Sequence, residues 1–237
     1  EDLRISPDRL EKSELRLVTD MHAYARDRGD GDFTLLRNQK EWGFLGFYPD
    51  FVLWLRVGEV EHIAFLDPKG LTLHNTADVA DKLMFSLALA GLEEKVRATA
   101  PNVRLSSFLL LNHDLRHYVD NEQQRDLLNA TLGRVLQERL LGSEAPGAVQ
   151  FTDQGLLDLL RALNARPLSG DVGDLLEAIR HDDKAARHEA VKAALQQALP
   201  EQVKDELKTF WEDVGLAASE KRLAAFVRDY GLSRWLE

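Results

Sequence analysis

The chain of 237 residues contains no cysteine. This absence excludes disulfide bonds and thiolate metal ligands, so any metal ion must be held by carboxylates, carbonyls, water or histidine. Ligand sets rich in oxygen favour Mg²⁺ or Mn²⁺. A protein without cysteine also fits the reducing cytoplasm, which is where we expect it to act.

Long apolar runs are absent as well. No stretch approaches the roughly 20 consecutive apolar residues of a transmembrane helix, and no signal-peptide pattern opens the chain. The composition, with 44% hydrophobic and 30% charged residues, predicts a folded protein with no membrane partner. The first residue is Glu1 rather than methionine, which indicates processing or a piece of a longer polypeptide.

Positive charge is scarce, because the formal net charge is −10. This balance argues against tight, sequence-independent binding of nucleic acid through charge alone. A local basic patch or a phosphate bridged by a metal ion would still allow contact. Arg37 and Lys40 lie just before the central hydrophobic segment and are candidates for such phosphate contacts.

The hydrophobic pattern divides the chain into an α/β part at residues 7–118 and a helical part at 119–237. In the first part we expect a helix, three strands, a helix and a strand, at about 7–28, 33–37, 51–57, 62–66, 78–99 and 103–111. The last strand carries a continuous apolar run, which indicates burial on both faces. The second part is predicted to be all helical, with helices at about 121–141, 152–163, 172–180, 184–199, 202–214 and 219–230, and linkers near 142–147 and 167–173.

The segment 48–70, YPDFVLWLRVGEVEHIAFLDPKG, is the most informative feature present. Two runs of apolar and β-branched residues flank a two-residue turn whose first residue is Gly58, a pattern typical of a β-hairpin. Pairing outward from that turn places Asp50 directly opposite Asp67, with side chains about 5 Å apart. Lys69 points to the same face as Asp67. Two facing carboxylates need a compensating cation, which Lys69 or a divalent metal ion can supply.

Glu14 is a second unusual acid. It falls in the middle of an apolar stripe on the first predicted helix, among Leu10, Leu17, Val18, Met21 and Ala25. A carboxylate there is costly unless it reaches water at the rim or meets a cation, a metal ion or hydrogen-bond donors. Both arrangements are compatible with the helix alone, and the nearby hairpin favours grouping Glu14 with the two aspartates.

Glu14, Asp50, Asp67 and Lys69 together suit metal-assisted hydrolysis of a phosphodiester. A divalent ion held by the acids lowers the pKa of bound water and stabilises the leaving oxygen. Lys69 can position or deprotonate the attacking water. Pro68 lacks an N–H group, so it ends strand pairing, but its carbonyl can be a further metal ligand.

Pro49-Asp50, followed by Asp67-Pro68-Lys69 and preceded by Glu14 on a helix, resembles the PD-(D/E)xK nuclease superfamily. The resemblance implies a restriction-endonuclease-like core, Mg²⁺ or Mn²⁺ as cofactor, and nucleic acid as substrate. It also implies that Asp50 and Asp67 are metal-binding acids, that Lys69 is the catalytic lysine, and that Glu14 is the acid of the first helix.

The hairpin segment further resembles the C-terminal endonuclease domain of type III restriction subunits and related helicases. This implies a DNA endonuclease of a restriction or antiviral defence system, with a helicase, translocase or recognition module in the same polypeptide or complex. Related enzymes present groups to DNA from the helix after the motif, where Lys82 lies, although an exposed first helical turn is the simpler interpretation. Two alternatives remain open. One is a catalytically idle docking domain with a nuclease-like fold, because Pro68 can distort the site, and the other is an RNA nuclease.

Overall fold

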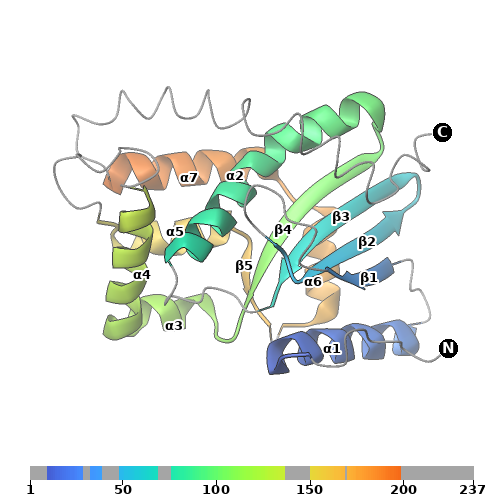
Figure 1. The fold of residues 1–237 in the computed structure, drawn as a ribbon, viewed down its shortest axis with the longest axis horizontal. Helices are drawn as coiled ribbons and strands as arrows, with labels where there is room; N and C mark the ends of the chain where they lie inside the picture. The colour runs from blue at the N-terminus through green and yellow to red at the C-terminus, as the bar shows by residue number, and fades with distance from the viewer. Residues whose placement is uncertain are drawn as a thin grey trace.

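A five-stranded mixed β-sheet with helices on both faces forms the centre of the molecule (Figure 1). The computed structural model describes residues 10–28, 33–38, 48–68, 76–136, 150–168 and 170–198. Within these residues the elements follow the chain as α1 Lys12–Arg28, β1 Phe33–Arg37, β2 Phe51–Val57, β3 Val60–Asp67, α2 Thr76–Thr99, β4 Val103–Leu111, α3 Leu115–Asp120, α4 Glu122–Leu136, α5 Asp153–Ala162, β5 Ala165–Pro167, α6 Val172–Arg180 and α7 Lys184–Ala198.

The strands lie in chain order across the sheet, from β1 to β5. The pairs β1–β2 and β2–β3 are antiparallel, whereas β4 is parallel to β3 and β5 is parallel to β4. The helix α2 makes the crossover that a parallel β3–β4 pair requires. The predicted order of helix, three strands, helix and strand is therefore confirmed for α1 to β4, within an α/β fold.

The β2–β3 hairpin has the turn and the register that the sequence predicts. Gly58 has a φ of 60°, and no atom lies within 4 Å of where its Cβ would be, so the position needs glycine for its backbone conformation. The strands pair from Val57–Val60 at the turn to Phe51–Leu66 at the far end. The pairing sets each side chain on a defined face of the sheet, because successive residues alternate between faces.

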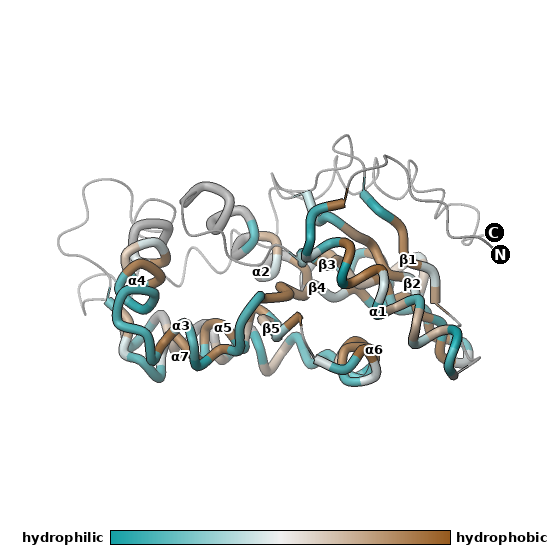
Figure 2. Tube along the Cα trace, turned by 90° about the horizontal axis from the view of Figure 1, so that it is seen from below, coloured by the Kyte–Doolittle hydropathy of each residue, from teal (hydrophilic) through white to brown (hydrophobic). Residues whose placement is uncertain are grey.

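Helices cover the two faces of the sheet differently. On one face, α1 and α6 pack against alternate residues of β2, β3 and β4, with Leu17, Phe51, Leu66 and Phe108 among the buried side chains. On the other face, α2 packs against the remaining residues of the same strands, in a cluster of Val52, Ile63, Phe65, Phe85, Leu89, Leu92, Val96, Ala100, Val103 and Leu105. The central strands are predominantly hydrophobic (Figure 2), as expected for strands covered on both sides.

The remaining helices gather beside the sheet at its β5 edge (Figure 1). A third buried cluster joins the end of β4 and β5 to α3, α4 and α5, through residues such as Leu111, Val119, Leu128 and Leu160. The C-terminal part therefore shares its core with the sheet. Among the residues that the structure describes, no helix combines the length and the hydrophobicity needed to cross a membrane.

Two predictions about the elements are wrong. The first helix begins at Lys12 and not at Pro7, because Leu10 and Glu11 are not helical. The C-terminal part is not all helical, because Ala165–Pro167 forms β5 and pairs with Leu109–Leu111 of β4. Proline is tolerated there because β5 is an edge strand. The helices expected at 202–214 and 219–230, and the linker at 142–147, lie outside the described residues.

Candidate functional site

A buried ion pair joins the end of β3 to the first turns of α2. The Nζ atom of Lys82 lies 2.9 Å from Oδ2 of Asp67, and the two side chains are only 4% and 5% exposed. An ammonium and a carboxylate at this depth are stable only as a pair, since either one alone would keep an unpaired charge away from water. The compensating cation that the hairpin requires is thus supplied, in this structure, by Lys82.

Asp50 immediately precedes β2, the strand that pairs with β3. The last pair of the ladder is Phe51–Leu66, so the register carried one residue further puts Asp50 opposite Asp67. Asp50 is also two residues from Val52, which packs on the α2 face, and alternation gives Asp50 the same face as Val52. The two aspartates therefore occupy neighbouring positions on the α2 side, where β2 begins and β3 ends.

The strand β3 ends just before Pro68, as the sequence predicts. Asp67 is the last residue of β3, and Pro68 is buried in the turn that follows it. The strands consequently part immediately after the carboxylate of Asp67. Lys69, the expected catalytic lysine, lies outside the described residues, as does Lys40.

Glu14 has a different environment from the one that its place in the sequence predicts. It is 2% exposed, and its Oε2 atom accepts hydrogen bonds from the backbone N–H of Glu11, at 3.0 Å, and from the Arg37 guanidinium, at 3.1 Å. Glu14 is the third residue of α1, so the first bond is the backward half of a capping box. The second bond ties α1 to β1. Glu14 thus caps its own helix and pairs with a cation on the strand.

The two ion pairs lie on opposite sides of the sheet. Arg37 is opposite Phe51, which packs beneath α1, whereas Lys82 comes from α2 on the other face. In the part of the chain described here, no three acidic or histidine side chains come together as a candidate metal site. The structure therefore brings Asp50 and Asp67 together and leaves Glu14 with Arg37.

Two carboxylates are nevertheless a ligand set that suits Mg²⁺. This ion is usually held by one or two carboxylates, with water and substrate phosphate completing its octahedral shell. Asp50 and Asp67, with the carbonyl of Pro68 next to Asp67 in sequence, fit this chemistry. The three-acid set that included Glu14 does not.

Lys82 and Arg37 do not lie where a contact with DNA requires them. Lys82 was expected on an exposed first turn of the helix, but its ammonium is buried against Asp67. Arg37 is 23% exposed and is hydrogen-bonded to Glu14. The sequence did carry a signal for the burial of Lys82, which lies on the apolar stripe of α2 formed by Phe85, Leu89, Leu92 and Val96.

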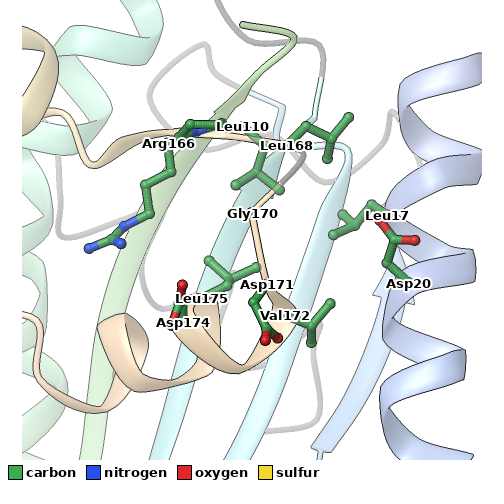
Figure 3. A pocket seen from close by; sticks show the side chains of 11 residues that line it. Leu17, Asp20, Leu110, Arg166, Leu168, Gly170, Asp171, Val172, Asp174 and Leu175 are labelled. Atoms are coloured by element: carbon green, nitrogen blue, oxygen red, sulfur yellow. The ribbon is translucent and has the colours of Figure 1, made fainter. Parts of the chain in front are cut away.

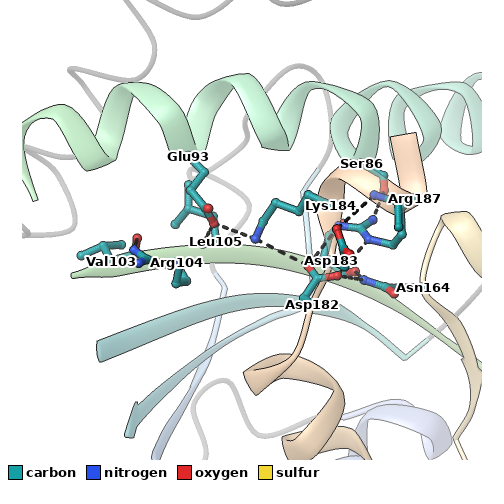
Figure 4. Close-up of polar contacts among 12 residues, drawn as sticks. Ser86, Glu93, Val103, Arg104, Leu105, Asn164, Asp182, Asp183, Lys184 and Arg187 are labelled. Atoms are coloured by element: carbon teal, nitrogen blue, oxygen red, sulfur yellow. Dashed lines mark hydrogen bonds and ion pairs between the residues drawn. The ribbon is translucent and has the colours of Figure 1, made fainter. Parts of the chain in front are cut away.

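A separate polar cluster covers the edge of β4 (Figure 4). It lies along the part of β4 that precedes Leu109–Leu111, the residues that pair with β5. The carboxylate of Glu93 accepts the N–H of Leu105 at 2.6 Å and pairs with Lys184 at 2.7 Å. Asn164 donates to the carbonyl of Ser107, at 3.1 Å. These side chains take the place of a neighbouring strand along this edge, so the cluster has a structural role.

Asp182 anchors the other end of this cluster. Its two oxygens accept from Nε and Nη2 of Arg187, at 2.9 and 3.0 Å, and Oδ1 also accepts from Asn164. Arg187 donates further to the carbonyl of Ala162. Asn164 has a φ of 52°, in the left-handed region that asparagine tolerates better than most residues. The cluster therefore fixes α7 and the turn before β5 to the sheet.

The α1 face holds a cavity of about 220 Å³ between α1, α6 and β5 (Figure 3). Its walls are mainly aliphatic, with Leu17, Leu110 and Leu175, and Asp20 and Arg166 also contribute. Asp171, at its edge, caps α6 by accepting the N–H of Gly173. This cavity lies on the opposite face of the sheet from the Asp67–Lys82 pair.

One histidine is buried within the sheet. His62 of β3 is 8% exposed, and burial lowers the pKa of its imidazole below the usual value of 6.5. The positive charges of Lys184, Arg104 and Arg180 lower this pKa further, whereas a hydrogen bond with the backbone of Ile179 raises it. His62 is therefore a neutral residue of the core at neutral pH.

No protein-family model, no curated protein and no solved structure matches the chain. The assignment of a function therefore depends on the geometry described above.

Proposed function

We propose that this chain is a metal-dependent endonuclease domain that hydrolyses phosphodiester bonds in DNA, with a restriction-endonuclease-like core formed by α1 to β4. The observation that carries the proposal is the hairpin register, which pairs Phe51 with Leu66 and, when extended by one residue, puts Asp50 opposite Asp67. Paired carboxylates at such a position are suited to divalent metal ions and phosphate groups. The order of elements and the parallel β3–β4 pair support the same proposal.

Each residue has a distinct role in this proposal. Asp50 and Asp67 hold Mg²⁺ or Mn²⁺, with the Pro68 carbonyl as a further ligand. When bound, the ion activates water and stabilises charge on the phosphoryl and leaving oxygens. Lys69 orients the attacking water or balances the charge on the phosphate. Glu14 acts indirectly, by fixing the start of α1 and the end of β1 through Arg37.

The net negative charge of the chain disfavours DNA binding by this chain alone. With a net charge of −10, the chain repels a polyanion overall. We therefore assign DNA capture to a helicase, translocase or recognition module in the same polypeptide or complex. A cytoplasmic restriction or defence system is the setting that this division of labour suits.

A second candidate function has one specific observation in its favour. Lys82 already neutralises Asp67 at 2.9 Å, as it would in a nuclease-like domain that no longer binds metal and serves in docking. In that case the ion pair of Lys82 and Asp67 only stabilises the fold and takes no part in metal binding. The two candidates make opposite predictions about catalysis.

Incubation with plasmid, linear and single-stranded DNA, and with RNA, in Mg²⁺ or Mn²⁺ separates these candidates. The chain should be tested alone and with its partner module. We expect DNA cleavage that EDTA abolishes and that Asp67→Asn and Asp50→Asn reduce at least about 100-fold, because each substitution removes a charged metal ligand. Asp171→Asn, at the cavity on the opposite face, is the matched control and should leave cleavage unchanged.

Cleavage that survives Asp67→Asn would reveal a contaminating nuclease and defeat the proposal. The absence of cleavage in every condition, with an intact fold, would favour the docking domain. Cleavage of RNA alone would reassign the substrate.

A further inference from the structure

We infer that Lys82 competes with the divalent metal ion for Asp67, so that this lysine sets the metal affinity of the site. This inference rests on the proposed metal site and adds a regulatory residue to it. The observation is the contact itself: an ammonium 2.9 Å from Oδ2 of Asp67, with both side chains almost fully buried.

The depth of the pair makes the competition strong. A buried carboxylate requires one positive partner, and that partner can be an ammonium or a metal ion. A divalent ion held by Asp50 and Asp67 and the ammonium of Lys82 repel each other, so the metal binds well only when the ammonium of Lys82 withdraws from Asp67 or shares it. Lys82 therefore keeps the fold stable when metal is absent, at the expense of metal affinity.

The position of Lys82 within α2 explains how the competition can be tuned. Lys82 is seven residues before Leu89 and three before Phe85, on the stripe of α2 that packs against the sheet. A shift of this first part of α2 would move the ammonium relative to Asp67.

The test replaces the charge of Lys82 and follows Mn²⁺ binding. Lys82→Met removes the charge at similar volume, and Lys82→Gln removes it while keeping a donor for Asp67. In EDTA we expect Lys82→Met to lower the melting temperature by about 10 °C, because a buried acid loses its partner. Saturating Mn²⁺ should restore at least about 5 °C of that loss, and more than it adds to the wild type. By electron paramagnetic resonance, Lys82→Gln should bind Mn²⁺ at least about tenfold more tightly than the wild type.

Two variants serve as controls. The double variant Asp67→Asn with Lys82→Met should lose the response to Mn²⁺, since the acid itself is gone. Arg37→Met breaks the pair with Glu14 on the opposite face and leaves Glu14 as a single buried acid. It should be destabilised in EDTA without being rescued by Mn²⁺.

The inference is overturned if Lys82→Gln binds Mn²⁺ no more tightly than the wild type, or if Mn²⁺ raises the melting temperature of Lys82→Met no more than that of the wild type. These results differ from those that test the nuclease. Tight Mn²⁺ binding by Lys82→Gln without any cleavage would keep this inference and defeat the nuclease proposal. A wild type that cuts DNA, with Mn²⁺ affinity independent of Lys82, would do the reverse.

Discussion

The substitution Arg187→Met tests whether the helices of the C-terminal part fold as one unit with the sheet. Arg187 holds Asp182 through two parallel hydrogen bonds, and the side chains are 13% and 3% exposed. Removing one partner of a buried ion pair costs about 3–5 kcal/mol. This range is the upper end for Arg187, because Asp182 stays buried but keeps Lys184 at 3.8 Å and the amide of Asn164. For a chain of this size that loss lowers the melting temperature by about 10 °C.

Differential scanning calorimetry is the appropriate assay, with two comparison variants. Arg187→Lys keeps the charge but not the planar fork, so it should lose about half as much stability. Arg161→Met removes a surface pair with Asp158, in which the side chains are 56% and 41% exposed, and should change stability by less than about 0.5 kcal/mol.

We expect Arg187→Met to shift one transition that includes the sheet. Two separate transitions, with the larger one unmoved, would refute the reasoning and indicate that the C-terminal part folds independently. A shift no larger than that of Arg161→Met would show that the buried pair contributes nothing.

Two further predictions concern the sheet itself. Because the pKa of His62 is lowered in the fold, the unfolded chain binds the proton more readily, so stability should decrease as the pH falls below about 6.5. In His62→Gln, urea titrations at several pH values should show a smaller loss across that range, and an unchanged slope would contradict the burial of a neutral imidazole. Gly58→Ala should cost about 1–2 kcal/mol in urea unfolding, because alanine at a φ of 60° is strained although space is open there, whereas Gly58→Asn should cost less. Equal losses for alanine and asparagine would argue against the turn conformation.

The hairpin and the central strand were predictable because local chemistry and burial agree there. Gly58 can adopt the turn that joins β2 and β3, and the alternation of apolar residues fixes the register. The continuous apolar run in β4 predicted burial on both faces. Phe108 and Leu110 pack with α1 and α6 on one face, and Leu109 and Leu111 pack with α3, α4 and α5 on the other. These features depend on residues close in sequence.

The environment of Glu14 was not predictable, because it depends on the start of α1. A helix that began at Pro7 would put Glu14 in mid-helix, where a buried acid needs an external ligand. The helix begins at Lys12, so Glu14 is in the first turn and caps it. An error of a few residues at a helix end therefore changed the interpretation of a functional candidate.

The strand β5 and the ion pair of Lys82 depend on tertiary structure. The three residues of β5 contain arginine and proline and have no strand pattern of their own; they pair because β4 offers an open edge. Lys82 lies on an apolar stripe, but only the packing of α2 on the sheet brings it to Asp67. A sequence pattern indicates that a cation is needed beside two acids, and the fold determines which residue supplies it.

The central claim is that Asp50 and Asp67 form a site for a divalent metal ion, and anomalous diffraction from crystals soaked in Mn²⁺ tests it most directly. We predict an anomalous peak in contact with the carboxylates of Asp50 and Asp67, accompanied by movement of the Lys82 ammonium away from Asp67. Density with no peak at these carboxylates, and with Lys82 still paired to Asp67 in saturating Mn²⁺, would contradict the claim.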